Sequence, residues 1–317
     1  MSVMPMQNLA RGNTGCGMQF GARLSRTSVD VSKISTFRWL LGMRALVATA
    51  VAVVVMVAPA AASARRPTWD AVSSETACLA NRNINSFLRA NHANVMRLIL
   101  SPQDAPVAAG IGCVEDAHAA GFRVYISLQF DNHWTPGQVA AYVAQVLPTY
   151  APYVWAIGLG NEQDLSMPAA YGQGTISLSR DGRSAGQNYR AVWNAVEPVL
   201  VKLAPRAIRV YGEFSPWGFS ATEQGFAHGR PPGVQAIAAH CYHTKVQGLV
   251  QIPRNAAWAR SKRLPLWCSE MGPALPRRTM PKWIVRDSWA SWNALLAKVV
   301  AKSPDLQMWG YYYDPAL

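Results

Sequence analysis

Short apolar segments alternate with helical patterns along most of this chain. The segments are rich in β-branched residues, as in NVMRLIL (94–100), and the stretches between them repeat apolar residues at helical spacing, as in 189–203. Successive strand–helix steps with right-handed crossovers build a parallel sheet that is either open and doubly wound or closed into a barrel. GLGNEQ (158–163) lacks the last glycine of a dinucleotide fingerprint and no Walker lysine motif occurs, so we expect an α/β fold of the (β/α)8 TIM-barrel type.

Seven strands are predicted in this way. They lie at 94–100, 123–130, 154–160, 207–214, 234–243, 263–270 and 306–313. A helical stretch at 79–92 requires a strand before it, but RRPTWDAVSSETAC (65–78) carries little strand signal. The first strand is therefore weak, and a short or irregular strand between Arg66 and Cys78 is needed to complete the barrel.

The N-terminal 64 residues differ in character from the rest. Residues 45–64 carry no charge, lie between basic residues and end in the small triplet Ala62-Ser63-Ala64. These features are typical of a secretory signal peptide over 43–64, cleaved after Ala64. The alternative is an uncleaved signal anchor, since about 20 apolar residues also span a bilayer. Either reading predicts export, to the outside of the cell, the cell surface or the periplasm, and cleavage leaves no stable membrane insertion.

Residues 1–42 are polar and show neither helical nor strand periodicity. We interpret them as a mis-assigned gene start, with Met43 as the true initiator, or as a disordered extension. Residues 65–317 contain no repeat or low-complexity linker and have about the ~250 residues of one (β/α)8 barrel. They are predicted to form a single catalytic domain.

The chain is basic, with 30 Lys and Arg against 17 Asp and Glu and a formal net charge of +13. It remains basic without the first 64 residues. This charge either favours anionic wall polymers and surfaces or only keeps the protein soluble. No dense Lys/Arg run is present, so nothing indicates nucleic-acid binding.

Four of the five cysteines follow the predicted signal, at Cys78, Cys113, Cys241 and Cys268. An even number in an oxidising compartment predicts disulfides, and four cysteines permit three pairings. We prefer the pairing of Cys78 with Cys113.

Polar residues stand where the predicted strands end. In a barrel of this type the C-terminal strand ends share one mouth, where the site is built. Glu162 and Glu270 each end an apolar strand, where a charge is costly unless it is used or paired. Two opposed carboxyl groups suit glycosidic bond cleavage, in which one protonates the leaving oxygen and the other attacks or stabilises the anomeric carbon. The alternative is a pair of ordinary ion-paired glutamates.

These residues carry a resemblance to a known group. GLGNEQ (158–163) resembles the Asn-Glu signature that closes strand 4 of the clan A glycoside hydrolases, and LWCSEMG (266–272) resembles their strand-7 glutamate. Arg97 resembles the strand-2 arginine of the clan, His240 and Tyr242 its strand-6 His-x-Tyr, and Trp309 the aromatic residue that closes strand 8. The order of the motifs along 94–313 makes the combination more specific than any one of them.

The resemblance implies a hydrolase that retains anomeric configuration, with Glu162 as general acid/base and Glu270 as nucleophile, their carboxyl groups ~5 to 5.5 Å apart. It also implies that Asn161 hydrogen-bonds the sugar 2-hydroxyl. Arg97 and Tyr242 are expected to hydrogen-bond Glu270 and keep it ionised. No cofactor or metal is implied.

Further strand-end and loop residues are assigned as substrate-binding candidates. His133 and His240 bind sugar hydroxyls, position the glutamates or are structural. Trp134, Trp309 and Tyr311 are candidate sugar-stacking platforms. Trp217 and Tyr313 are further candidates, with packing in the core or rim as the alternative. Glu213 is an extra acid that could take either catalytic role, but we favour its interpretation as a substrate-hydroxyl acceptor or a surface charge. The loops 163–186 and 214–233 are expected to form the walls of the cleft.

Two other functions fit parts of this pattern. One is a metal-dependent hydrolase that uses Asp131, His133, His240 and His243. The other is a barrel that binds polysaccharide, such as an anionic cell-wall polymer, without cleaving it. The sugar, the linkage and endo or exo action depend on loop geometry that a sequence does not display.

Overall fold

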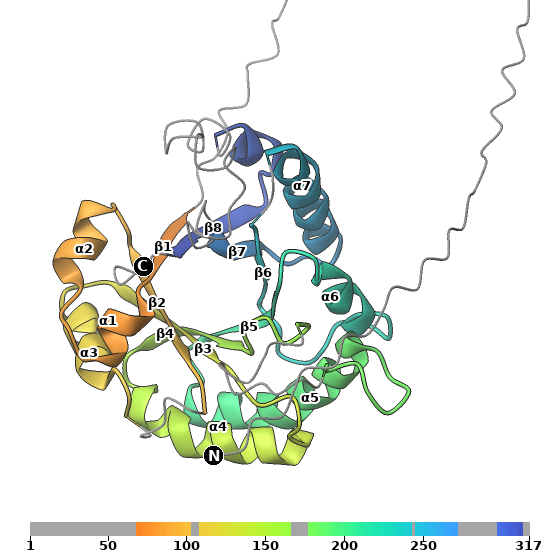
Figure 1. Cartoon of the computed structure of the whole chain (residues 1–317), viewed down its shortest axis with the longest axis horizontal. Helices are drawn as coiled ribbons and strands as arrows, with labels where there is room; N and C mark the ends of the chain where they lie inside the picture. The colour runs from red at the N-terminus through yellow and green to blue at the C-terminus, as the bar shows by residue number, and fades with distance from the viewer. Residues whose placement is uncertain (1–67, 103–107, 166–176, 243–244, 272–296, 313–317) are drawn as a thin grey trace, which may run out of the picture. The chain divides into compact units, whose positions relative to one another are not determined.

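Eight parallel strands close into a barrel in chain order, as expected from the sequence (Figure 1). The structure is a computed structural model that describes residues 68–102, 108–165, 177–242, 245–271 and 297–312. The strands are β1 (Trp69–Ser73), β2 (Val95–Leu100), β3 (Arg123–Leu128), β4 (Val154–Leu159), β5 (Ile208–Phe214), β6 (Ala236–His240), β7 (Leu266–Met271) and β8 (Leu306–Tyr312). The predictions for residues 1–42 and 43–64 fall outside the described residues.

The weakly predicted first strand is present as β1 and completes the barrel. Ala71 of β1 pairs with Val95 of β2 on one side and with Gly310 of β8 on the other. Asn94 reinforces the pairing, because its side chain accepts the backbone N–H of Asp70 at 2.9 Å and its own N–H bonds to the carbonyl of Asp70. The short strand is thus held by its two neighbours, which compensates for its weak intrinsic preference.

The helices surround the barrel on its outside (Figure 1). They are α1 (Glu75–Leu79), α2 (Asn85–Ala90), α3 (Ile111–Ala119), α4 (Pro136–Tyr150), α5 (Ala185–Leu203), α6 (Phe219–Gly225) and α7 (Lys245–Ser261). The prediction of one helical stretch at 79–92 was wrong, because the chain turns at Asn81 (φ +54°) and separates α1 from α2. Asparagine tolerates this left-handed conformation better than most residues. The helix expected around Trp289 lies mostly outside the described residues.

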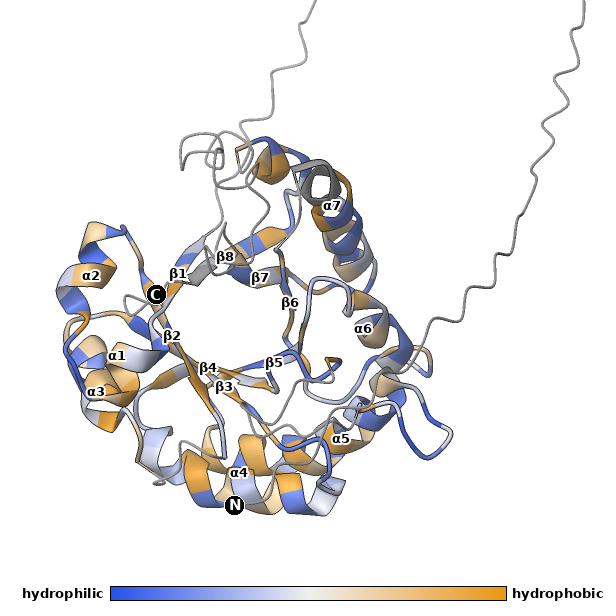
Figure 2. Ribbon diagram, viewed as in Figure 1, coloured by the Kyte–Doolittle hydropathy of each residue, from blue (hydrophilic) through white to orange (hydrophobic). Residues whose placement is uncertain are grey.

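Apolar and polar residues alternate along the outer helices, as Figure 2 shows for α4 and α5. Both helices begin with a capping box, formed by Thr135 with Gln138 and by Ser184 with Gln187. Pro198 lies inside α5 without ending it. Among the described residues no helix is long and apolar enough to cross a membrane.

The barrel interior is filled by large side chains that alternate with alanines. Trp267 of β7 and Tyr125 of β3 are buried and meet edge to face at 5.6 Å between ring centroids. The Arg97 guanidinium lies 5.7 Å from the centroid of the Tyr125 ring. This packed layer forms a floor on which the polar strand-end residues rest.

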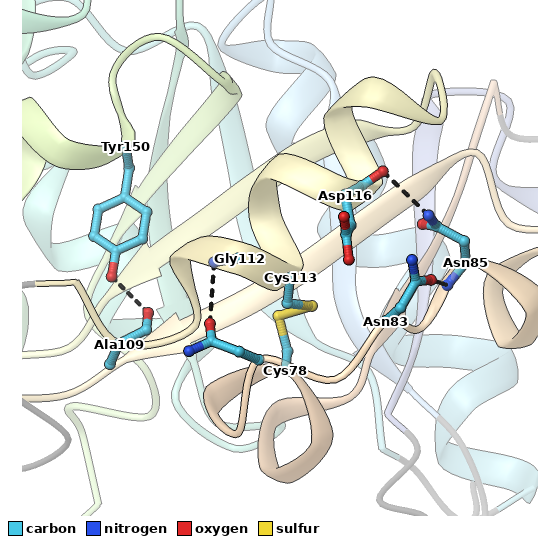
Figure 3. The surroundings of a disulfide bond; sticks show 9 residues. Cys78, Asn83, Asn85, Ala109, Gly112, Cys113, Asp116 and Tyr150 are labelled. Carbon is cyan, nitrogen blue, oxygen red and sulfur yellow. Dashed lines mark hydrogen bonds between the residues drawn. A yellow bond between two sulfur atoms is a disulfide. The ribbon is translucent and has the colours of Figure 1, made fainter.

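Two disulfides are formed among the residues that the structure describes. The preferred pairing of Cys78 with Cys113 is confirmed, and Cys241 pairs with Cys268. Figure 3 shows the first bond joining α1 to α3, beside the hydrogen bond from Asn85 to the carbonyl of Asp116. The second bond joins the ends of β6 and β7 next to His240 and Glu270.

Candidate active site

Arg97 of β2 is the centre of a buried polar cluster at the strand ends. Its guanidinium nitrogens donate to side-chain oxygens from four strands and from the turn after β4: Ser73, Ser127, Asn161, Glu213 and Glu270. Burial alone would lower the pKa of Arg97, but the carboxylates of Glu213 and Glu270 raise it well above its ordinary value. The arginine is therefore a fixed positive charge whose orientation is set on every side.

Glu270 lies one residue before the end of β7, and its carboxylate accepts two hydrogen bonds from described side chains. Arg97 Nη1 lies 2.6 Å from Glu270 Oε1, and the Tyr242 hydroxyl donates to Oε2 at 3.1 Å. Burial works to raise the pKa of Glu270, but His240 and Arg97 together hold it below its ordinary value. The carboxylate is thus ionised at neutral pH and only 8% exposed. Such a group is suited to attack an electrophilic carbon.

Glu162 lies in a tight turn directly after β4. Gly160 and Glu162 both have positive φ angles, +87° and +52°, and the Glu162 N–H donates to the carbonyl of Glu213 at 2.7 Å. The buried Gln163 side chain fixes the turn from below through the carbonyl of Phe130. A left-handed conformation is unusual for a residue other than glycine, and its presence here directs the Glu162 side chain to the mouth of the barrel.

His240 of β6 contacts both candidate catalytic carboxylates. Its Nδ1 lies 2.8 Å from Glu162 Oε1, and its Nε2 lies 3.4 Å from Glu270 Oε1. Burial would lower the pKa of His240, but Glu270, together with Glu162 and Glu213, raises it to about 10. The ring is therefore an imidazolium at neutral pH. Because the His240 ring contacts both Glu162 and Glu270, the two carboxylates lie at the same mouth of the barrel.

The charge of His240 predicts how stability depends on pH. Because its pKa rises from 6.5 to about 10 on folding, the protonated ring stabilises the native state fully below pH 6.5, and this contribution is lost as the pH rises towards 10. We expect the melting temperature of the wild type to fall between pH 7 and 10 more steeply than that of His240→Gln. His133→Gln, at the exposed rim, should keep the wild-type slope. Thermal melts across this pH range measure the slope of melting temperature against pH. Equal slopes in the wild type and His240→Gln would contradict this assignment.

The ends of β6 and β7 are held together at the site. The Cys241–Cys268 disulfide joins the two strands, and the Cys241 N–H donates to the carbonyl of Glu270 at 2.7 Å. The strand register shifts here between Ala239 and His240 and again after Cys268. The covalent link thus stabilises an irregular pairing that aims His240 and Glu270 inward.

The remaining predicted site residues lie in different surroundings. Asn161 accepts a hydrogen bond from Arg97 at 3.1 Å, which fixes its side chain beside the cluster. His133 bonds Asp131 and is 46% exposed at the rim, so it lies outside the buried cluster. Trp134 packs partly buried against Tyr142, and Trp309 is buried. The side chain of Tyr311 lies outside the described part of the structure.

The interpretation of Glu213 as a surface charge was wrong. The residue is fully buried, and its carboxylate contacts Arg97 and accepts from the Ser269 hydroxyl at 3.3 Å. Ser73 and Ser127, which hold Arg97, were also missed by the sequence analysis. The position of Ser127 could have been predicted from strand alternation. It lies two residues after Tyr125 on β3, so its side chain points to the same inner face of the barrel.

Of the four residues in the metal-site alternative, the three that the structure describes do not gather into a metal site. His133 pairs with Asp131, whereas His240 is surrounded by glutamates, and His243 lies outside the described residues. Within the described ranges no group of three or more His, Cys, Asp or Glu side chains is arranged to hold a metal ion.

Comparison with known proteins gives the fold. No family model matches the chain, and no curated protein matches it. Among solved structures, the chain is similar to an endo-β-1,4-mannanase double mutant from Cellulomonas fimi (TM-score 0.53, 12% identity, 78% of this chain) and to a GH39 β-xylosidase from Caulobacter crescentus (TM-score 0.54, 14% identity, 78% of this chain). It spans 65% and 64% of their lengths.

A third similar structure is the GH26 β-mannanase of Bacteroides ovatus, with a TM-score of 0.52, 12% identity and coverage of 80% of this chain and 83% of that one. These proteins are clan A glycoside hydrolases, so the fold implied by the resemblance is confirmed. At identities of 12–14% the likeness concerns the fold, and the activity has to be argued from the site itself.

Proposed function

We propose that this chain is a retaining glycoside hydrolase that cleaves O-glycosidic bonds of an oligo- or polysaccharide by double displacement. The observation that carries the proposal is the arrangement of Glu270, bonded by Arg97 and Tyr242, and Glu162, which contacts the opposite side of the same His240 ring. One carboxylate is held ionised and the other stands at the opening of the site. This is the division of roles that two-step glycoside hydrolysis requires.

In the first step the ionised Glu270 oxygen attacks the anomeric carbon while Glu162 transfers its proton to the departing glycosidic oxygen. A glycosyl ester of Glu270 forms and the alcohol leaves. In the second step Glu162, now ionised, takes a proton from water, the water oxygen attacks the anomeric carbon, and Glu270 is released as a carboxylate. Asn161 is proposed to bond the sugar 2-hydroxyl, an interaction that strengthens in the transition state.

Export belongs to this proposal. Two disulfides agree with an oxidising compartment, and residues 43–64 have the composition of a signal peptide. The chain remains basic without its first 64 residues, which suits action near anionic wall polymers. An extracellular carbohydrate is thus the proposed substrate.

The direct test is a screen of the purified 65–317 fragment against polysaccharides and aryl glycosides, with the anomer of the first-formed product followed by NMR. We expect hydrolysis with retention of configuration. Inversion would contradict the assignment of Glu270 as a nucleophile. Binding of polysaccharide without turnover would instead favour the non-catalytic barrel.

Trp217 is a candidate platform for a sugar unit beside the site. It is 71% exposed, in a turn closed by the bond from the Gly218 N–H to the Ser215 carbonyl. Asp164, two residues after Glu162, holds this turn by accepting from the Ser215 N–H and hydroxyl at 2.8 and 2.6 Å. The indole is therefore presented from a rigid turn tied to the Glu162 loop.

We expect Trp217→Ala to raise KM for an oligosaccharide about 2- to 10-fold with little change in kcat, because stacking on an aromatic ring contributes about 0.5–1.5 kcal/mol. Trp217→Phe keeps a ring and should fall between this variant and the wild type. Val250→Ala, a similarly exposed apolar position on α7, is the control. Steady-state kinetics that show no change in KM for Trp217→Ala would exclude this role.

A further inference from the structure

Glu213 is a third carboxylate in the site, and the two-step chemistry does not use it. It lies at the end of β5 and is fully buried, whereas the side chains of Glu162 and Glu270 are 16% and 8% exposed. Its Oε2 contacts Arg97 Nη2, accepts from Ser269 Oγ at 3.3 Å and lies 3.7 Å from His240 Nε2. A group enclosed in this way has no path to a substrate atom, so any effect on the reaction passes through its neighbours.

Gly158 of β4 leaves the space that the Glu213 carboxylate occupies. A Cβ atom at this position would lie 2.8 Å from Glu213 Oε1 and 2.6 Å from the Tyr125 hydroxyl. Among the described residues, Oε1 accepts no hydrogen bond, so the carboxylate is held through its other oxygen by Arg97. A buried charge with one unsatisfied oxygen is costly, which points to a role other than stability.

The backbone of Glu213 also supports the Glu162 turn. Its carbonyl accepts the Glu162 N–H at 2.7 Å, and both residues have positive φ angles, +66° for Glu213 and +52° for Glu162. Gly212 before it has φ +115°, and the register between β5 and β6 shifts at this point. Glu162 and Glu213 thus both have left-handed backbones and are joined by a backbone hydrogen bond. Local irregularities of this kind are common at functional sites.

The four charges at the strand ends balance when Glu213 is counted with them. With Glu162 protonated, the cations Arg97 and His240 face the anions Glu213 and Glu270. After the glycosyl ester forms, Glu270 is neutral and Glu162 is ionised, so the sum is the same. Glu75 of α1 acts on Arg97 in both states, and Tyr242 stays neutral because burial raises its pKa. Without Glu213, the two cations would face one carboxylate of the strand-end cluster in either state, with Glu75 as the remaining anion that acts on Arg97.

We propose that Glu213 is a positioning residue that shares Arg97 with Glu270 and keeps the buried charge of the site balanced while Glu270 and Glu162 exchange charge. This inference rests on the proposed hydrolase function. It assigns a task to a carboxylate that touches neither the substrate nor the reacting atoms.

Glu213→Gln tests the inference because it keeps the size of the side chain and removes its charge. We expect kcat to fall roughly 10- to 100-fold with KM little changed, because Arg97 loses its orientation relative to Glu270. The pH–activity profile should move towards acid, since removing one negative charge makes the remaining coupled groups lose protons more readily. Glu197→Gln, which removes a partly buried glutamate beside Arg209 away from the mouth, should change neither quantity.

A second readout does not depend on turnover. NMR follows the imidazole signals of His240 across pH in the wild type, Glu213→Gln and Glu197→Gln. We expect the midpoint of the His240 titration to fall by ~1 pH unit or more only in Glu213→Gln. Gly158→Ala provides an independent variant, because the added methyl crowds both the Tyr125 hydroxyl and the Glu213 carboxylate while the charge of Glu213 remains. It should lower kcat without the shift towards acid.

The outcomes separate the two proposals. If the wild type hydrolyses no glycoside, the proposed function fails, and the His240 titration still decides whether Glu213 sets the charge of the cluster. If the wild type is active and Glu213→Gln matches it in kcat, pH profile and His240 midpoint, the role of Glu213 is overturned while the function stands.

Discussion

Glu270→Gln is expected to lower turnover by roughly four to six orders of magnitude on every glycoside substrate. The amide cannot form the glycosyl ester, so the two-step path is closed whatever the leaving group. The isosteric change keeps the volume of the side chain in a nearly buried position, and the native fold should survive it. Circular dichroism and thermal melts check the fold, and initial rates on an aryl glycoside and on a natural polymer measure the loss.

Replacement of Glu162 is expected to give a different pattern, and this difference tests the assignment of the two roles. Glu162→Ala should lose roughly 10²- to 10⁴-fold on a substrate with a poor leaving group, since general acid catalysis contributes about that much. On an activated aryl glycoside the first step needs little acid assistance. The glycosyl ester of Glu270 should then accumulate, and azide should restore turnover by forming a glycosyl azide of retained configuration.

Glu197→Gln is the matched control for both variants, because it removes a carboxylate that pairs with Arg209 away from the barrel mouth. It should keep wild-type rates. Wild-type rates in both Glu162 and Glu270 variants would refute the double-displacement proposal. Loss of activity on addition of a chelator alone would favour the metal-dependent alternative.

The strands were predictable because most of them are buried on both faces. Parallel barrel strands carry nearly continuous apolar residues, and the segments that became β2 to β8 show this composition directly in the sequence. The exception, β1, has only Ala71 and Val72 as buried apolar residues, so its pattern is too short to be recognised. Its pairing with both β2 and β8 is a tertiary effect that local preference does not express.

The inward direction of the glutamates was less accessible to sequence reasoning. On β5, Val210 faces the barrel interior and Tyr211 packs against the outer core, so strict alternation directs Glu213 outward. The positive φ angles at Gly212 and Glu213 and the register shift beside them reverse this direction. A surface charge was therefore the natural reading of the sequence, and the irregular backbone made it wrong.

The same effect operates on β7. Trp267 faces the interior and Cys268 the outer core, and alternation would place Glu270 with Cys268. The register shift between Cys268 and Met271 turns Glu270 towards Arg97 instead. The strand-7 motif was recognised by its resemblance, but the register shift that turns Glu270 inward was not predicted. Strand-end irregularities thus limit what periodicity can reveal at an active site.

Arg97→Lys is expected to lower kcat roughly 100-fold and to move the acid limb of the pH–activity profile towards higher pH. A lysine ammonium has three donors and cannot reproduce the contacts that the guanidinium makes with Glu270, Glu213 and Asn161. Arg97 is one of the groups that lower the pKa of Glu270, so weakening its contact raises that pKa, and the nucleophile becomes ionised only at higher pH.

The direction of this shift distinguishes Arg97 from Glu213, because the loss of a negative charge moves the profile the opposite way. Arg97→Ala would leave Glu213 buried without its partner, at a cost of about 3–5 kcal/mol in the free energy of unfolding, so the lysine variant is the better kinetic probe. Arg209→Lys, at the ion pair with Glu197, serves as its control and should leave the profile unchanged. An acid limb that stays in place in Arg97→Lys would show that the ionisation of Glu270 does not depend on the guanidinium contacts of Arg97.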